Sequence, residues 1–269
     1  MSKLYRNAKQ FLGDAIIPVR YHVPFRYYIN RWRGLLEQEL DLLDAVVKRD
    51  DLVVDVGANR GIYVYKLWHL GARIEAFEPN PSCFHLLNGW AKGKYSISLH
   101  RVALSDHAGR ATLHIPIDRE GVEHDASASI SPVVAEGVRE QNVSMDTLDS
   151  FQFTNVAFIK IDVEGHEDKV ISGASQTIRN SRPAILVEIE QRHSGIPVDD
   201  MFRRITSQSY SGFFLLNGKL ESLTNFNTRV HQDSSGASTK RNQYINNFLF
   251  LDKKKLESGA YKALRRFGL

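Results

Sequence analysis

The sequence predicts an α/β fold in which helices cover both faces of a mainly parallel central sheet. Short runs rich in branched apolar residues alternate with stretches of helical period along the 269-residue chain. A composition of 42% hydrophobic and 25% charged residues is that of an ordinary globular protein. Two further strand-like runs follow the last helical stretch, and we expect them to form an antiparallel strand pair at the C-terminal end of the sheet.

The expected elements follow from apolar spacing. A helix over residues 37–47, with Leu40, Leu43 and Val47 on one face, precedes the first strand. The predicted strands are 52–56, 73–77, 97–103, 156–161 and 184–189, and the two late runs are 210–216 and 248–251. The other predicted helices are 62–70, 82–92, 167–179 and 198–207, and Gly71 has the position of a helix-ending glycine.

Two segments depart from this alternation. About fifty residues separate the third and fourth strands; 109–116 alternates like a strand, and 125–131 is small and polar. A loop of this length is usually functional or mobile. Residues 225–247 are polar and are predicted to be a mobile excursion. The domain prediction is one domain over 49–251, a basic, aromatic helical extension over 1–48 and a basic tail over 252–269.

The single cysteine, Cys83, excludes an internal disulfide and a cysteine-rich zinc site. It is expected to be a buried helix residue rather than a nucleophile, because no base is evident beside it. No apolar run approaches the roughly 20 residues of a membrane span, and the first thirty positions lack a signal peptide pattern. These features favour a soluble, cytoplasmic protein.

Positive charge gathers at the two ends of the chain. Residues 1–33 carry +6 and residues 251–269 carry +4, which leaves −6 for the middle of a chain whose net charge is +4. In the first segment Arg20, Arg26, Arg31 and Arg33 are interleaved with Tyr21, Phe25, Tyr27, Tyr28 and Trp32. This pattern predicts contact with an anionic membrane surface, at its inner face, or with a lipid-linked, phosphate-bearing acceptor. Alternatively, the aromatic residues cap the core and the tail, with Leu256, Tyr261 and Leu264, is a solvated helix.

A ligand-binding turn is predicted after the first strand. The chain there reads Asp55-Val56-Gly57-Ala58-Asn59-Arg60-Gly61, and a helix begins at once, so a ligand can approach the backbone closely. The spacing departs from the fingerprint of dinucleotide binding, which favours an amino-acid carboxylate over a pyrophosphate. The second strand ends in Glu78-Pro79-Asn80, and Glu78 is placed to accept hydrogen bonds from two ribose hydroxyls.

With these motifs the chain resembles the FkbM family of S-adenosylmethionine-dependent methyltransferases. The resemblance continues through Val102-Ala103-Leu104-Ser105-Asp106, Asp146-Thr147-Leu148-Asp149, Ile159-Lys160-Ile161-Asp162-Val163-Glu164-Gly165-His166-Glu167 and the segment 183–189. It implies a class I, Rossmann-like methyltransferase fold and methyl transfer to a hydroxyl of a sugar, glycan or secondary metabolite.

The resemblance also implies roles for particular residues. Asp55, Gly57, Asn59 and Gly61 would hold the methionine part of S-adenosylmethionine, Glu78 with Asn80 would hold the ribose, and Ser105 and Asp106 would flank the adenine. Acceptor choice would lie in residues 1–45 and beyond 210, outside the likeness.

Carboxylates at the ends of the fourth and fifth strands are the candidates for the acceptor side. Asp162, Glu164, Glu188 and His193 can converge there, because neighbouring parallel strands lie about 4.8 Å apart. Asp162, Glu188 and His193 are the catalytic candidates; in this interpretation Asp162 faces the cationic centre of the cofactor, and His193 or His166 acts as the base. Alternatively, Asp162, Glu164 and Glu188 hold Mg²⁺.

A purely structural interpretation of this segment is also open. In it, Glu164-Gly165 is a turn that opens the next helix, Glu167 and Asp168 favour the start of that helix, and His166 is solvated. For His166 this interpretation is favoured. Lys160 is given no role.

Three other functions were weighed against methyl transfer to a small acceptor. A nicotinamide-dependent oxidoreductase is disfavoured because the turn lacks the second glycine that admits a pyrophosphate. A non-catalytic nucleotide-binding protein is disfavoured because Asp55, Asn59 and Glu78 are all present. An RNA methyltransferase fits a pI near 9.1, but the basic residues cluster at the ends without a stacking motif, so a nucleic-acid partner is not expected.

Overall fold

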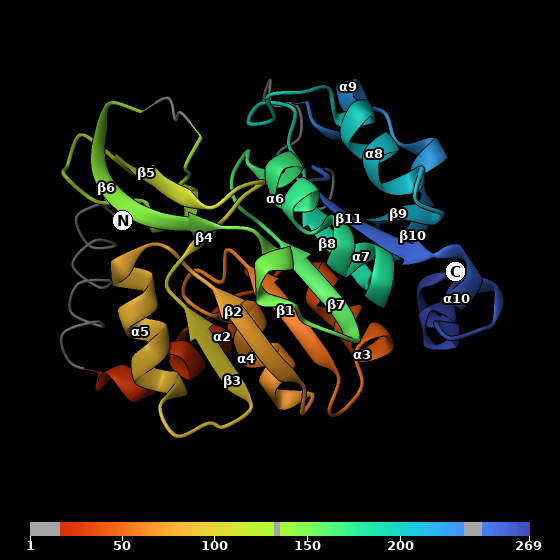
Figure 1. The fold of residues 1–269 in the computed structure, drawn as a ribbon, viewed down its shortest axis with the longest axis horizontal. Helices are drawn as coiled ribbons and strands as arrows, with labels where there is room; N and C mark the ends of the chain where they lie inside the picture. Colours follow the sequence, from red (N-terminus) through yellow and green to blue (C-terminus); the bar gives the residue numbers. More distant parts are fainter. Residues whose placement is uncertain (1–16, 132–134, 234–243) are drawn as a thin grey trace.

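The computed structural model describes residues 17–131, 135–233 and 244–269. Residues 1–16, which begin the predicted basic extension, and residues 234–243 of the predicted excursion lie outside that description. Within it, the chain forms a large sheet with helices on both faces and a small second sheet beside it (Figure 1).

The central sheet has the strand order β10-β9-β11-β8-β7-β1-β2-β3. Its strands are β1 (Leu52–Val56), β2 (Arg73–Phe77), β3 (Ile97–His100), β7 (Val156–Ile161), β8 (Ala184–Glu188), β9 (Tyr210–Leu216), β10 (Lys219–Ser222) and β11 (Asn247–Asp252). The five neighbouring strands β8, β7, β1, β2 and β3 pair in parallel. Strand β11 is antiparallel to both β8 and β9. The predicted mainly parallel sheet with antiparallel strands at its C-terminal end is confirmed.

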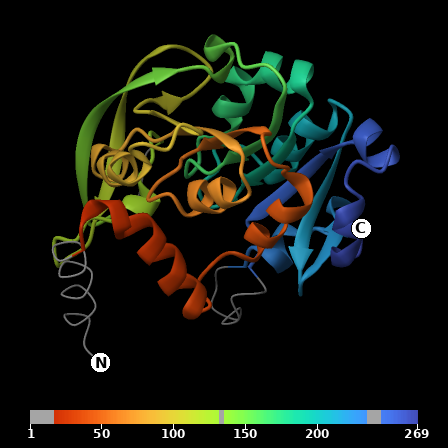
Figure 2. The ribbon, with the colours of Figure 1, turned by 90° about the horizontal axis from the view of Figure 1, so that it is seen from below.

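Helices cover both faces of this sheet, as predicted. One face packs against α2 (His22–Trp32), α3 (Leu43–Val46), α4 (Ile62–His69) and α5 (Pro81–Ala91), and the other against α6 (Glu167–Gly173), α7 (Ser175–Ser181) and α8 (Val198–Thr206). Successive strand residues point to opposite faces, so Val53 joins one apolar cluster and Val54 the other. Figure 2 shows the two groups of helices on opposite sides of the sheet.

The predicted third strand, residues 97–103, is wrong as a single strand. β3 pairs with β2, but the chain leaves the sheet after His100, and β4 (Ala103–Leu104) pairs with β6 (Gly137–Asp146) in the second sheet. The His100 ring stacks on Phe77 with 4.6 Å between centroids, and its Nε2 lies 2.7 Å from the Glu75 carboxylate. These contacts hold the end of β3, while Ala103 and Leu104 are buried as the edge strand of the second sheet.

The second sheet pairs β6 with β5 (Gly109–Ile117). The strand-like pattern of residues 109–116 is therefore confirmed, whereas β6 was not predicted. Only Val143 and Met145 near the end of β6 are buried, and the partly buried positions before them on the same side include Arg139 and Gln141. An apolar alternation is thus present in only half of the strand.

Two predicted helices are interrupted. Residues 37–47 form the 3₁₀ turn η2 (Gln38–Asp41) and the single turn α3 in place of one helix, although Leu40, Leu43 and Val47 are all buried as predicted. Residues 167–179 form α6 and α7, which meet at Ala174. There Gly173 lies against the backbone of Ser105, and the Asp149 carboxylate accepts the N–H groups of Gln176 and Thr177 at 2.8 Å each, which starts a new helix.

The C-terminal tail is part of the folded body. It forms α10 (Lys253–Glu257) and η6 (Lys262–Phe267), and its residues Tyr261 and Leu264 are buried in the cluster that includes α4. Arg266 Nη2 donates to the backbone carbonyl of Asp41 at 2.9 Å. The interpretation of the tail as a solvated or membrane-facing helix is therefore corrected for these apolar residues. No helix among the described residues is long and apolar enough to cross a membrane.

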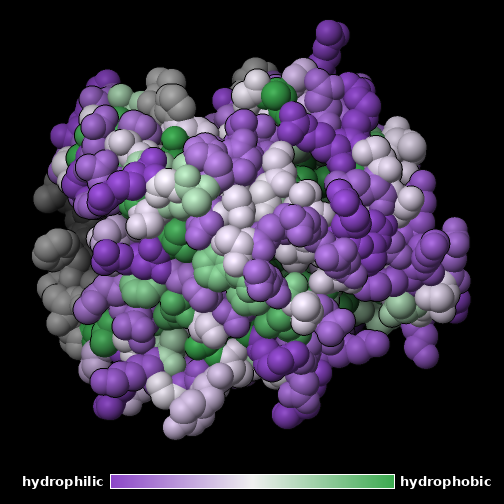
Figure 3. Space-filling model, in the orientation of Figure 1, coloured by the Kyte–Doolittle hydropathy of each residue, from purple (hydrophilic) through white to green (hydrophobic). Residues whose placement is uncertain are grey.

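The described parts of residues 225–247 are also tied to the sheet. They contain the end of η5 (Leu223–Asn225) and α9 (Thr228–His231). Gln232 Nε2 donates to the backbone carbonyls of Ile189 and Ile245 at 2.6 and 2.9 Å. These bonds join the two ends of the segment beside the tip of β8. Hydrophilic residues gather over α8 nearby, on the face shown in Figure 3.

Candidate active site

The turn after β1 is shaped by two glycines. Gly57 has φ +82°, and a Cβ there would lie 1.8 Å from the carbonyl oxygen of Asp162 at the end of β7. A Cβ at Gly61 would lie 2.5 Å from Leu87 of α5. Both positions therefore require glycine. The N–H groups of Gly57 and Ala58 both donate to the backbone carbonyl of Phe77 at 3.0 Å, and α4 begins at Ile62 directly after the turn.

Glu78, at the tip of β2, is bonded to the turn after β1. Its Oε2 accepts the backbone N–H of Asn59 at 2.6 Å, and its Oε1 accepts the backbone N–H of Asn80 at 2.7 Å. Each carboxylate oxygen can accept a second donor. Burial raises the pKa of Glu78 to about 7.

Asp55 is buried at the end of β1, and its Oδ2 has no hydrogen-bond partner among the described residues. Burial raises its pKa to about 7. A buried acceptor without a donor is uncommon in folded proteins and fits a ligand that supplies one. The amino group of S-adenosylmethionine is such a donor, so the residues present fit the cofactor.

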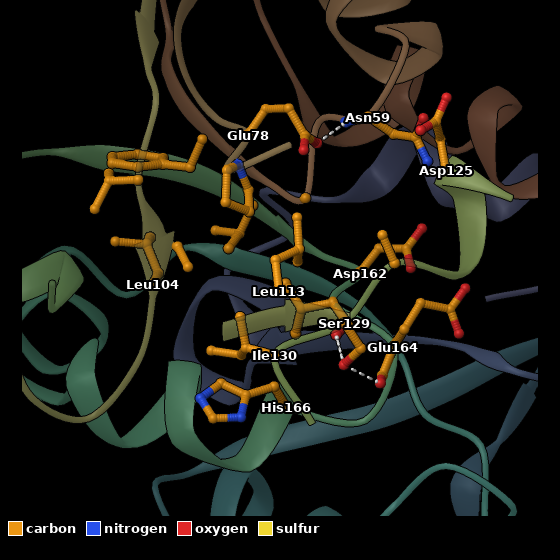
Figure 4. Close-up of a pocket in the computed structure, with 18 residues that line it drawn as sticks. Asn59, Glu78, Leu104, Leu113, Asp125, Ser129, Ile130, Asp162, Glu164 and His166 are labelled. Atoms are coloured by element: carbon orange, nitrogen blue, oxygen red, sulfur yellow. Dashed lines mark hydrogen bonds between the residues drawn. The ribbon is translucent and has the colours of Figure 1, made fainter. Parts of the chain in front are cut away.

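A pocket lies between these strand tips and the second sheet. It is lined by Val56, Gly57, Asn59, Phe77, Glu78, Pro79, Val102, Ala103, Leu104, Leu113, Asp125, Ala128, Ser129, Ile130, Asp162, Val163, Glu164 and His166. Figure 4 shows Leu104, Leu113 and Ile130 gathered on one side and Asn59, Asp125 and Asp162 on the other. The pocket thus offers an apolar wall and a polar wall.

Asp125 belongs to the polar wall and was not singled out from the sequence. It lies in η3 (Asp125–Ser127), where its carboxylate accepts from Arg60 Nη2 at 2.6 Å and from Asn80 Nδ2 at 2.8 Å. Asn80 also caps α5 by accepting the N–H of Ser82. The signal in the sequence was the small, polar stretch 125–131 in an unusually long connection, which supplies Asp125 to the polar wall and Ile130 to the apolar wall.

Of the residues predicted to hold the cofactor, Gly57, Asn59 and Glu78 line the pocket, whereas Asp55, Gly61, Asn80, Ser105 and Asp106 do not. The Ser105 hydroxyl lies 2.9 Å from His166 Nε2, and Asp106 accepts from Lys169 Nζ at 3.0 Å. Val102, Ala103 and Leu104 occupy the pocket wall instead. The expectation that His166 is merely solvated is wrong, because this half-buried side chain lines the pocket. Cys83 is buried, as expected, and its thiol donates to Asn59 Oδ1 at 3.5 Å.

Three carboxylates converge at the polar end of the pocket. One oxygen each of Asp162, Glu164 and Glu188 lies within 4.8 Å of the other two. His193 Nδ1 lies 2.9 Å from Glu164 Oε2, so the four residues predicted to converge do so. Glu164 and Gly165 both have positive φ, which confirms the predicted turn between β7 and α6.

Burial raises the pKa of all three carboxyl groups. Burial raises the pKa of Glu164 to about 8 and also raises the pKa values of Asp162 and Glu188. The nearby charge of Asp162 raises the pKa of Glu188 further. Carboxylates this close cannot all ionise easily. The cluster therefore has a high affinity for a proton near neutral pH.

Lys160 is the cation beside this cluster. Its side chain is buried, and its Nζ donates to Asn247 Oδ1 at 3.0 Å and lies 3.7 Å from Asp162 Oδ2. Asn247 Nδ2 in turn donates to Glu37 Oε2 at 3.4 Å, as does the Tyr63 hydroxyl at 2.6 Å. In the sequence, this network is indicated by a lysine within an otherwise apolar strand of the parallel sheet, because a buried charge needs partners.

A second set of bonds surrounds the tip of β8. Asn246 Nδ2 donates to Glu188 Oε1 at 2.6 Å and to Glu190 Oε1 at 3.2 Å. Glu190 also accepts from the Tyr244 hydroxyl at 3.0 Å and pairs with Arg192. Of these residues only Glu188 was predicted for the site. Asn246 and Tyr244 were not, since their positions depend on how β11 pairs with β8.

The sheet order, the glycine turn after β1 and the acid at the tip of β2 define a class I S-adenosylmethionine-dependent methyltransferase. Residues 55–211, more than half of the chain, match the model of the "Methyltransferase FkbM domain". The chain belongs to the FkbM methyltransferase family.

One relative in sequence and one solved structure are similar to this chain. The chain is 26% identical over 180 residues to the hexuronic acid methyltransferase AglP of Haloferax volcanii, an alignment that covers 63% of this chain and 67% of AglP. It is similar in fold to the crystal structure of a methyltransferase FkbM from Methylobacillus flagellatus KT, with a TM-score of 0.50 and 15% identity. That match covers 81% of this chain but 45% of the other, so the chain spans less than half of that protein's length.

Proposed function

We propose that this methyltransferase transfers the methyl group of S-adenosylmethionine to a hydroxyl oxygen of a sugar or glycan. The observation that carries the proposal is that Asp162 and Glu164 line the pocket and also converge with Glu188. An acceptor hydroxyl at these three carboxylates would lie beside both the cofactor pocket and a group of proton acceptors. The name of the relative AglP, a hexuronic acid methyltransferase, supports a sugar acceptor.

In this proposal the cofactor lies along the strand tips. Asp55 and the turn from Gly57 to Gly61 would hold the methionine part, and Glu78, with Asn80 behind it, would accept the ribose hydroxyls. The apolar wall at Leu104, Leu113 and Ile130 would cover the adenine, a role that replaces the one predicted for Ser105 and Asp106.

The bound cofactor supplies an electrophilic methyl group, so the chain must orient the acceptor and remove its proton. The acceptor oxygen forms its bond to the methyl carbon as the bond from that carbon to sulfur breaks. We assign the released proton to the carboxylates of Asp162 and Glu188. His193, held by Glu164, is the alternative proton acceptor.

Mg²⁺ is the other way to activate the hydroxyl. Asp162, Glu164 and Glu188 offer hard oxygen ligands at a spacing that fits one cation. The Lys160 ammonium already supplies a positive charge 3.7 Å from Asp162, which favours the proton-transfer route.

The experiment is transfer of a labelled methyl group to a panel of acceptors, with product analysis. Neutral hexosides, hexuronides and RNA are compared at equal concentration. Label on a sugar oxygen supports the proposal, whereas label confined to RNA would overturn it.

Residence in the cytoplasm and attachment to an anionic surface stay predictions of the sequence.

A further inference from the structure

Helix α2 has two seams with opposite surroundings. Val23 and Tyr27 are buried against the body of the protein, and the Tyr27 ring packs 4.8 Å from that of Tyr65 in α4. On the other seam Phe25, Tyr28 and Trp32 follow at helical spacing and are 49%, 56% and 84% exposed. Tyr21, just before the helix, is 50% exposed and extends this row. We call Tyr21, Phe25, Tyr28 and Trp32 the aromatic row.

This concentration of exposed apolar side chains is local. Among the residues that the structure describes, the other large hydrophobic side chains with high exposure are Leu35, which follows the helix, and the scattered Tyr95, Val138 and Val230. Single exposed apolar residues are ordinary, but a contiguous group marks an interaction surface. Figure 2 shows α2 at the margin of the molecule.

The charge around the aromatic row has one sign. Residues 17–35 contain four arginines and no acidic residue. Arg20, Arg31 and Arg33 are exposed, and the Arg20 guanidinium lies 4.9 Å from the centre of the Tyr21 ring. The surface therefore combines rings suited to a membrane interface with cations suited to phosphate.

The aromatic row also lies near the cofactor turn. A Cβ at Gly61 would come 3.3 Å from Val23 Cγ1 on the buried seam of α2, and Val19 of η1 (Val19–Tyr21) contacts Gly89 of α5. A partner on the aromatic row is thus separated from the Gly57–Gly61 turn by little more than the helix itself.

We propose that α2 docks on an anionic phospholipid membrane through the aromatic row and its exposed arginines. A second copy of the chain fits less well, because a twofold interface would bring the arginines of both copies into one patch of like charge. Docking at a membrane implies that the acceptor is a lipid-linked or membrane-bound sugar. This statement about the acceptor rests on the proposed function, whereas the docking itself does not. The apolar residues Tyr261 and Leu264 of the C-terminal tail take no part, since they are buried.

The arginines and the aromatic rings of this surface contribute separately to membrane binding. Each arginine near an anionic surface strengthens binding about five-fold, and salt screens this effect. The rings contribute at the interface with little dependence on salt. Binding should therefore require anionic lipid, fall about ten-fold or more between low salt and about 0.5 M NaCl, and need both sets of residues.

The test is flotation of the full chain with vesicles of phosphatidylcholine, with and without phosphatidylglycerol. The triple variant Phe25→Ser/Tyr28→Ser/Trp32→Ser and the pair Arg31→Gln/Arg33→Gln should each lose most binding. The matched control Tyr95→Ser/Val230→Ser removes exposed apolar residues elsewhere and should bind like the unaltered protein. S-adenosylhomocysteine binding, measured on each variant, confirms that it is folded.

Flotation that needs phosphatidylglycerol and is lost in the triple variant supports the proposal, whatever acceptor is methylated. No flotation at low salt overturns it. Equal binding to pure phosphatidylcholine, a dimer abolished by the triple variant, or RNA binding through the same residues would each also overturn it. Flotation without methyl transfer to any sugar would leave the docking standing and reject the proposed function.

Discussion

The carboxylate of Glu78 accepts the backbone N–H of Asn59 at 2.6 Å, which joins the tip of β2 to the glycine turn after β1. One side chain thus both shapes the turn and offers its remaining acceptor capacity to the pocket. The two motifs recognised in the sequence are therefore parts of one hydrogen-bonded structure.

Replacement of Glu78 by Ala should weaken S-adenosylhomocysteine binding by about 1 to 3 kcal/mol, because a charged acceptor for the ribose is lost. Isothermal calorimetry measures this directly. The matched control is Asp106→Asn, also in a motif of the family resemblance but outside the pocket, which should bind normally. A normal dissociation constant for Glu78→Ala would remove this residue from the site.

Cofactor binding should also weaken as pH falls below 7. Burial raises the pKa of Glu78 and of Asp55 to about 7, so each gains a proton on acidification and loses acceptor capacity. One pH unit below that pKa, about a tenth of each group is ionised, so the dissociation constant should rise about ten-fold or more. Glu78→Gln and Asp55→Asn should each flatten part of the profile, and their combination should flatten it fully. A profile unchanged in both variants would contradict the assignment.

Two glycines with the same backbone conformation provide a stability test. Gly57 and Gly93 both have φ +82°, but a Cβ at Gly57 would lie 1.8 Å from the Asp162 carbonyl oxygen, whereas one at Gly93 meets nothing within 4 Å. Gly93→Ala should therefore cost only the backbone strain of about 1 to 2 kcal/mol. Gly57→Ala should cost more than about 3 kcal/mol and abolish cofactor binding. Urea unfolding compares the two, and equal losses would show that the close contact at Gly57 is relieved cheaply.

The sequence predicted the parts of the fold that depend on local pattern. The runs that became β1, β2, β7 and β8 are short and apolar, so their ends, and the convergence of Asp162, Glu164 and Glu188, could be foreseen. The break after His100 could not, because Ala103 and Leu104 continue an apolar run whose partner, β6, lies forty residues later. Strand β10 was missed although Asn217-Gly218 is a typical hairpin turn before it.

Long-range neighbours explain the missing site residues. Lys160 is oriented by Asn247, and Glu188 is bonded to Asn246, yet these asparagines lie far along the chain and reach the site only through the antiparallel pairing of β11 with β8. Asp125 reaches the pocket through the fold of the long connection. The spacing of residues in the sequence does not indicate such contacts.

The route of proton removal can be separated from metal activation. If the carboxylates take the proton, turnover should persist in the presence of a chelator, and His193→Ala should lower it only modestly. If His193 is the base, its replacement by Ala should lower turnover about 10²-fold or more. Loss of turnover in chelator, restored by Mg²⁺ while S-adenosylhomocysteine still binds, would establish the metal route instead.

The most direct test of the proposed function is the effect of Glu188→Gln on binding and on turnover, measured on the same preparation. Glu188 lies outside the cofactor pocket but within 4.8 Å of Asp162 and Glu164, so its charge should matter for the acceptor and not for the cofactor. We expect S-adenosylhomocysteine to bind with an unchanged dissociation constant, while methyl transfer to the sugar hydroxyl falls about 10²-fold or more. Normal turnover in this variant would contradict the assignment of the carboxylate cluster to the acceptor side.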